Sequence, residues 1–216
     1  MMHDLTPCPL CSRIDTHPFH QDIQREYFIC PACDVVFVHP KYYLDRKDEL
    51  KRYELHKNTI GDSGYRSFLQ QLCSPLLERL ASESIGLDFG SGPGPLLKIM
   101  LEEHGHTISL FDTFYAPDKK VFECSYDFIT ATEVVEHLHH PLFELDRLWS
   151  HLNPDGYLGV MTSLRNREVS FPRWHYLSDP THVVFYSAET MKWVATRWGA
   201  SMEVISDSVV FFKKSG

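Results

Sequence analysis

The spacing of apolar positions changes along the chain. Residues 46–58 and 64–82 carry apolar side chains at helical spacing, whereas from Ser84 short apolar runs alternate with amphipathic segments. Together they predict the following order: strand 85–89, helix 95–104, strands 106–112 and 126–132, helix 142–152, a turn at 153–156 and strand 157–163. A helix capped by Ser187 should run to Trp198, before a hairpin of strands 201–206 and 208–214. Strands alternating with helices indicate an α/β fold with a doubly wound, mostly parallel sheet.

Composition and charge narrow the classes of partner. The 216 residues, 43% of them hydrophobic, suffice for one full-sized domain and a small appendage. A net charge of −8 argues against long nucleic acid, whose phosphates need a basic surface. No apolar run approaches the roughly 18 residues of a membrane helix, and the first residues do not resemble a secretory signal. We therefore expect a cytoplasmic protein.

Four of the six cysteines form two Cys-x-x-Cys pairs, Cys8 with Cys11 and Cys30 with Cys33, which are 18 residues apart. This spacing is typical of a ribbon that binds one tetrahedral zinc ion, and the alternative is a set of disulfides or buried thiols. Four thiolates leave no open position on the metal, so the zinc is expected to be structural. Residues 1–46 carry four basic and six acidic side chains, so the ribbon is expected to cover an active site or dock a partner.

A glycine-rich loop, LDFGSGPG, follows the first predicted strand of the sheet. Ligands of open parallel sheets bind beyond the carboxyl ends of the strands, and glycines let a ligand approach the backbone closely. The spacing of Gly90, Gly92 and Gly94 is one residue too short for the dinucleotide fingerprint. Asp88 before the loop suits an ammonium group, and Asp112 at the end of the second strand suits ribose hydroxyls. Such a ligand, without a diphosphate, describes S-adenosylmethionine.

Three segments resemble class I S-adenosylmethionine-dependent methyltransferases: LDFGSGPG, YDFITATEVVEHLHHP and LNPDGYLGVMTS. The similarity covers residues 84–212 and is greatest to small-molecule enzymes of the ubiquinone-biosynthesis O-methyltransferase type. It implies a Rossmann-like sheet of the seven-stranded type. Only 14 residues separate Asp112 from Asp127, so the family's third strand and the helix before it are expected to be shortened. The predicted domains are a zinc ribbon at 1–40, a helical linker or cap at 41–83, and the S-adenosylmethionine-binding methyltransferase domain at 84–216.

The resemblance also implies cofactor contacts. Asp88 and the glycine loop should hold the methionine end and Asp112 the ribose, while Phe111 or Thr113 should lie at the edge of the adenine. The acidic residue that contacts adenine in the family is left open between Asp118 and Glu123. The full cofactor-binding set is Asp88, Gly90, Ser91, Gly92, Gly94, Asp112, Thr113 and Glu133.

The acceptor side is predicted from two segments. In the ubiquinone-type relatives an element similar to Glu133, Glu136 and His137 binds a divalent cation, which implies a candidate second metal site here; the alternative is that these residues shape the pocket without metal. The connection 163–187 is too aromatic for disorder and is predicted to be a substrate lid.

Removal of a proton from the acceptor calls for a base, for which histidine is suited near neutral pH. His182 is the first candidate because a turn precedes it, and His137 and His175 follow. Alternatively, His182 only holds the lid in shape.

These observations predict a methyltransferase that acts on a small-molecule acceptor by O-, N- or C-methylation. A second hypothesis is an RNA or protein methyltransferase whose ribbon recognises the macromolecule. A third is a non-catalytic module that binds the cofactor or a partner.

Overall fold

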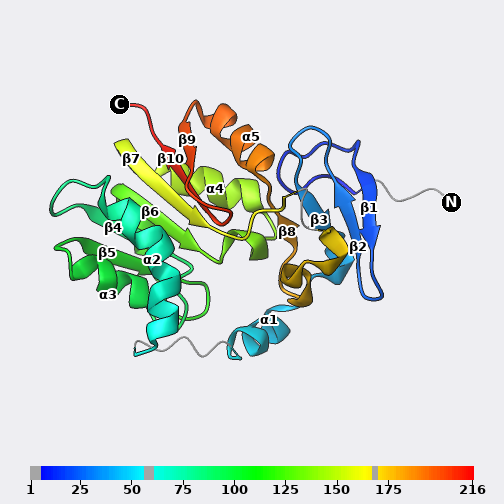
Figure 1. Ribbon diagram of the computed structural model, residues 1–216, viewed down its shortest axis with the longest axis horizontal. Coiled ribbons are helices and arrows are strands. Elements are labelled where there is room, and N and C mark those ends of the chain that lie inside the picture. Colours follow the sequence, from blue (N-terminus) through cyan, green and yellow to red (C-terminus); the bar gives the residue numbers. More distant parts are fainter. Residues whose placement is uncertain (1–5, 56–60, 167–169) are drawn as a thin grey trace.

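The computed structural model describes residues 6–55, 61–166 and 170–216. Its largest element is a six-stranded sheet in the order β5-β4-β6-β7-β10-β9 (Figure 1). These strands are β4 (Ile85–Phe89), β5 (Thr107–Phe111), β6 (Tyr126–Thr132), β7 (Leu152–Met161), β9 (Ser201–Val204) and β10 (Val209–Lys213). The first four strands in this order are parallel, and β10 runs antiparallel to both of its neighbours. The predicted α/β fold, its mostly parallel sheet and its terminal hairpin are confirmed.

Helices cover both faces of this sheet (Figure 1). The helices are α2 (Ser63–Leu77), α3 (Leu96–Glu102), α4 (Pro141–Ser150) and α5 (Ala188–Trp198). Phe128 and Phe211 pack in the cluster that contains α2 and α3, whereas the neighbouring Ile129 and Phe212 pack in the cluster that contains α4 and α5. Alternate residues of a strand point to opposite faces, so the central strands are largely apolar because both of their faces are buried.

One prediction of local structure is wrong. Residues 153–156 do not form a turn before a strand but lie inside β7, where Asp155 has φ +62° and the register with β6 shifts. The extra residues form a bulge, which lets the ladder resume at Tyr157. The segment after β5 is shortened, as expected: it holds the 3-10 helix η2 (Lys119–Glu123) and no strand, so the described sheet has six strands.

Residues 6–40, called the ribbon below, contribute three strands to a second, smaller sheet at one end of the molecule (Figure 1). Its antiparallel strands are β1 (His17–Gln21), β2 (Glu26–Ile29), β3 (Val36–Val38) and β8 (Val184–Phe185). The last of these comes from the predicted lid, so distant parts of the chain build the ribbon's sheet together (Figure 1).

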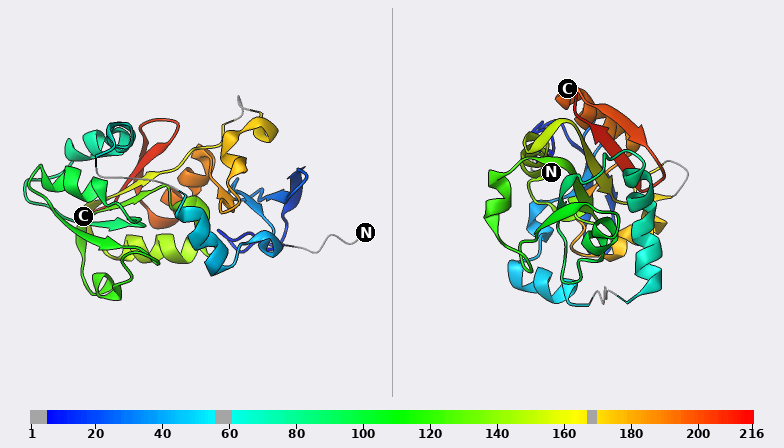
Figure 2. Two further views of the ribbon diagram at one scale, coloured as in Figure 1. Left: turned by 90° about the horizontal axis from the view of Figure 1, so that it is seen from below. Right: turned by 90° about the vertical axis from the view of Figure 1, so that its left-hand side faces the viewer.

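Helix α1 (Arg46–Tyr53) begins at Asp45, whose side chain accepts hydrogen bonds from the amides of Lys47 and Asp48. The predicted helix 46–58 extends into residues 56–60, which lie outside the described part of the chain. Figure 2 shows α1 and the segment 170–186 between the ribbon and the large sheet. None of the helices in the described ranges is long and apolar enough to cross a membrane.

Candidate active site

A cavity of about 980 Å³ opens at the carboxyl ends of β4, β5 and β6. One part of its wall consists of the glycine loop 90–94, residues 111–115 and residues 132–134, and residues of α1 and of the segment 175–182 contribute another part. A parallel sheet binds ligands at this edge, as the sequence predicts. The adenine candidates Asp118 and Glu123 do not line the cavity, whereas Phe111 and Thr113 do.

Two positions of the loop require glycine, for different reasons. Gly90 has φ +77°, and a Cβ atom there would lie 2.2 Å from a methyl carbon of Val134. Gly92 has φ +61°, but a Cβ there would meet no described protein atom within 4 Å. Because Gly92 lines the cavity, its bare backbone faces space that a ligand can fill.

Asp112 joins the two loops of this wall. Its Oδ2 accepts a hydrogen bond from the Gly92 amide at 3.0 Å, and its Oδ1 accepts from the amides of Phe114 and Tyr115 at 2.8 and 3.0 Å. A carboxylate offers about four lone-pair positions, so Asp112 can still accept a ribose hydroxyl. Asp112, the residue predicted to bind the ribose, therefore lies in the cavity wall, where it also fixes the glycine loop.

Three buried hydroxyls of the cavity wall have no hydrogen-bond partner among the described residues. They are the Oγ of Ser91, the Oη of Tyr115 and the Oγ1 of Thr132. Buried polar atoms without partners are costly, so these hydroxyls fit a ligand that carries several polar groups. Ser91 was predicted from the sequence, but Tyr115 and Thr132 were missed. Thr132 ends β6 at the ligand-binding edge, and this position is a signal that could have identified it.

Asp88 lies behind the glycine loop and not in the cavity wall. Its side chain is buried, and its Oδ1 accepts a hydrogen bond from the Thr130 hydroxyl at 2.9 Å. Burial raises the pKa of Asp88 from 3.8 to about 6, although the bond from Thr130 opposes this shift. A direct contact with the methionine end of the cofactor stays a prediction.

Replacing Asp88 with asparagine is expected to stabilise the ligand-free protein at pH 7. The folded protein holds the carboxyl proton more tightly than the unfolded chain, so stability falls as the pH rises from about 4 to about 6. This loss amounts to about 3 kcal/mol at pH 7, and Asp88→Asn removes it while keeping an acceptor for Thr130. Urea unfolding at pH 4 and pH 7 measures the effect. A stability difference that is the same at both pH values would contradict the expectation.

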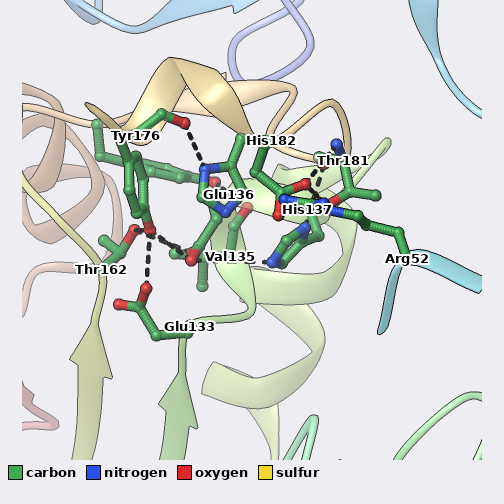
Figure 3. Close-up of polar contacts among 11 residues, drawn as sticks. Arg52, Glu133, Val135, Glu136, His137, Thr162, Tyr176, Thr181 and His182 are labelled. Carbon is green, nitrogen blue, oxygen red and sulfur yellow. Dashed lines mark hydrogen bonds and ion pairs between the residues drawn. The ribbon is translucent and has the colours of Figure 1, made fainter. Parts of the chain in front are cut away.

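A buried polar cluster lies beside the cavity on the acceptor side (Figure 3). The Tyr176 hydroxyl donates to Glu136, whose Oε2 accepts from the Thr162 hydroxyl at 2.9 Å, and Oε2 of Glu133 lies 3.4 Å from the Tyr176 oxygen. Burial raises the pKa of both glutamates, and the charge of Glu136 raises that of Glu133 further. Glu133 also has φ +51°, a strained conformation that is typical of functional sites.

His137 and His182 meet edge to face next to this cluster, with their ring centres 4.7 Å apart (Figure 3). Nδ1 of His182 lies 2.8 Å from the Tyr176 carbonyl, and Nδ1 of His137 lies 3.2 Å from the Thr181 carbonyl. A carbonyl only accepts, so Nδ1 is the donor and Nε2 carries the lone pair in each neutral ring. Burial, reinforced by His137, lowers the pKa of His182 to about 4. His175 lines the same cavity but is exposed.

One ligand atom from each of Glu136, His137 and His182 lies within 4.8 Å of the others. The resemblance implied Glu133 as the third member of this group; within the described residues His182 takes that place, and Glu133 approaches Tyr176 instead. One carboxylate and two imidazoles are ligands that suit a divalent transition metal.

The four cysteines of the ribbon also converge. Their sulfur atoms all lie within 4.8 Å of one another, with 3.6 Å between Cys8 and Cys33 and 3.3 Å between Cys11 and Cys30. A tetrahedral zinc ion with Zn–S bonds of about 2.3 Å separates its sulfur ligands by roughly 3.8 Å. The donor set and its spacing therefore fit zinc.

Comparisons with known proteins agree with this fold. A family model described as a methyltransferase domain matches residues 65–203. The chain is similar to 1,6-didemethyltoxoflavin-N1-methyltransferase from Burkholderia thailandensis, whose structure contains 1,6-didemethyltoxoflavin and S-adenosylhomocysteine; the TM-score is 0.59 at 15% identity, over 92% of this chain and 99% of that one. No curated protein matches the chain.

Two further structures share the fold. An S-adenosylmethionine-dependent methyltransferase from Archaeoglobus fulgidus has a TM-score of 0.54 at 15% identity, over 79% of this chain and 100% of that one. CalO1, a methyltransferase of calicheamicin biosynthesis with bound S-adenosylhomocysteine, has a TM-score of 0.53 at 12% identity, over 80% and 59%. The family match spans more than half of the chain and includes the glycine loop and the histidines of the acceptor side. The chain therefore belongs to the methyltransferase-domain family, and it shares the fold of S-adenosylmethionine-dependent methyltransferases.

Proposed function

We propose that the protein is a cytoplasmic enzyme that methylates a small molecule carrying an acidic O–H, N–H or C–H group. The observation that carries this proposal is that the glycine loop and His182 line the same cavity. The toxoflavin and calicheamicin enzymes, which share the fold, are named for small-molecule chemistry. The negative net charge disfavours the alternative of an RNA substrate.

The cofactor, when bound, supplies a methyl group on a positively charged sulfur. The glycine loop and the three unpartnered hydroxyls would hold it, with Asp112 at the ribose. Nε2 of His182 accepts the proton of the acceptor, and Nδ1–H remains on the Tyr176 carbonyl, which stabilises the imidazolium that forms. Helix α1 and the segment 175–182 limit access of water to the cavity.

The candidate cation site offers a different role for His182. A divalent cation held by Glu136, His137 and His182 would polarise an acceptor oxygen, as the resemblance to the ubiquinone-type enzymes implies. The two roles exclude each other, because one lone pair on Nε2 cannot hold a proton and a metal ion at once. A native mass spectrum that counts two metal ions per chain, one of them beyond the ribbon, would favour the cation.

We also propose that the four cysteines of the ribbon hold one structural zinc ion. The donor set supports this, because four thiolates complete the tetrahedral coordination of zinc and leave no open position for chemistry.

The proposed function is tested by incubating the protein with methyl-labelled S-adenosylmethionine and a cell extract separated into small molecules, RNA and protein. Label should enter the small-molecule fraction and should be lost with Asp112→Ala. Label in RNA or protein would support a macromolecular substrate instead. Cofactor binding without transfer to any fraction would support the non-catalytic module.

Replacing His182 with alanine is expected to lower kcat by about 10²- to 10⁴-fold, the range that general-base catalysis contributes. The Kd for S-adenosylmethionine should stay within about twofold, because His182 lies outside the segments 90–94 and 111–115 that are proposed to hold the cofactor. The control is His151→Ala, a histidine that does not line the cavity. Turnover of His182→Ala at the level of this control would leave His182 with the structural role alone.

A further inference from the structure

Arg25 of the ribbon is a buried cation that reaches into the acceptor side. Its side chain is 5% exposed. One terminal nitrogen donates to the carbonyl oxygens of Pro180 at 3.3 Å and His182 at 2.9 Å, and the other donates to the carbonyl of Leu177 at 2.7 Å. Nε faces the hydroxyl of Tyr27 at 3.2 Å. A single side chain of the ribbon thus binds three backbone positions that lie more than 150 residues away.

These three carbonyls belong to the segment that carries His182. The segment contains one short 3-10 helix, η5 (His175–Ser178), followed by a turn, so its carbonyls have few partners in regular structure. Buried carbonyls need hydrogen-bond donors, and a planar guanidinium can supply several at fixed angles. Arg25 therefore takes the place of a strand or helix in holding this backbone.

Backbone pairing with the ribbon fixes Val183, the residue after His182. The amide of Val38 in β3 donates to the carbonyl of Val183 at 3.0 Å, and the amide of Val183 donates to the carbonyl of Glu136 at 2.9 Å. Val183 is thus held between the ribbon and the loop that bears Glu136 and His137. His182 lies between this clamp and the contacts of Arg25.

We propose that the ribbon is a working part of the acceptor site and that Arg25 is a positioning residue that sets the location of His182. The inference rests on the proposed role of His182 in methyl transfer. A lysine at this position carries the same charge but lacks the fork of donors, so the geometry requires arginine.

The test compares Arg25→Ala and Arg25→Lys with Arg13→Ala. Arg13 lies on the same ribbon but is exposed and pairs with the nearby Asp15. Both Arg25 variants should keep one zinc per chain and an unchanged Kd for S-adenosylmethionine, while kcat falls by on the order of 100-fold, as for misplacement of a catalytic group by about 1 Å. Arg13→Ala should turn over like the wild type.

Chemical rescue separates positioning from general destabilisation. Guanidinium ions at millimolar concentration should restore part of the kcat of Arg25→Ala, because they can donate to the same carbonyls, whereas ammonium at equal ionic strength should not. Guanidinium should not rescue His182→Ala. If Arg25 only stabilised the fold, guanidinium would not restore activity at millimolar concentration, which is far below the molar range in which it unfolds proteins.

Hydrogen exchange supplies a readout that needs no acceptor. Amides of residues 176–184 should exchange faster in Arg25→Ala than in Arg13→Ala, and guanidinium should slow them again, while β4 and β6 stay protected. If the wild type transfers no methyl group, the proposed function fails but this exchange result still decides the role of Arg25. Equal exchange in the two variants, wild-type turnover of Arg25→Ala, or joint loss of zinc and cofactor binding would overturn the proposal.

Discussion

Gly92→Ala is expected to weaken the binding of S-adenosylmethionine by on the order of 10- to 100-fold, because the added methyl group occupies space that the cofactor needs. No described protein atom lies within 4 Å of the added Cβ, so the substitution causes no steric clash with the described part of the protein. The remaining effect on the protein is the strain of φ +61°, which costs about 1–2 kcal/mol for a residue with a side chain.

Gly105→Ala is the matched control for this strain. Gly105 has φ +85°, a Cβ there also meets no described atom within 4 Å, and the residue does not line the cavity. Urea unfolding should therefore give similar stabilities for the two variants, while calorimetric titration should show weaker cofactor binding for Gly92→Ala alone. Equal affinities in the two variants would place the cofactor elsewhere than along the glycine loop.

Cys8→Ser is expected to abolish methyl transfer while the protein still binds its cofactor. Structural zinc contributes roughly 10–16 kcal/mol of apparent binding energy to small metal-bound units, so loss of one ligand should unfold the ribbon. The acceptor side would then lose the contacts of β3 with β8. The glycine loop is anchored by β4, β5 and Asp112, none of which belongs to the ribbon, so we expect the cofactor Kd to change by less than about tenfold.

Cys124→Ser is the control, because Cys124 is an exposed thiol outside the cysteine cluster. Metal content, cofactor Kd and kcat should be measured on both variants and on protein treated with a chelator. Full turnover by a zinc-free protein would show that the ribbon's metal has no part in the acceptor site. Loss of cofactor binding together with zinc would instead make the ribbon essential to the whole fold.

Elements whose signals are local were predictable from the sequence. Ser187 was expected to cap a helix, and its hydroxyl accepts a hydrogen bond from the amide of Thr190 at the start of α5. The largely apolar run 126–132 became β6 with the predicted limits, because its side chains pack against the helices on both faces of the sheet. The glycine loop and Asp112 were predictable because each of them lies at the end of one predicted strand.

Features that depend on distant residues could not be predicted in this way. Nothing in the two-residue strand β8 indicates that its partner lies about 150 positions earlier in the chain. In the sequence, Arg25 counts only as one of the four basic residues in the net charge of residues 1–46, because a sequence does not show its three carbonyl partners. His182 was chosen because of the turn before it, but its meeting with Glu136 and His137 required the folded chain.

The pairing of β3 with β8 also determines when the small sheet can be completed during synthesis of the chain. Val36 and Phe37, both fully buried in the finished protein, emerge early in translation and find their partners only when residues 184 and 185 have left the ribosome. Until then the nascent chain presents an apolar strand edge, which is a template for association between chains. Prematurely terminated products that end before residue 184 never cover that edge, so they are the forms of this protein on which chaperones and proteases should act first.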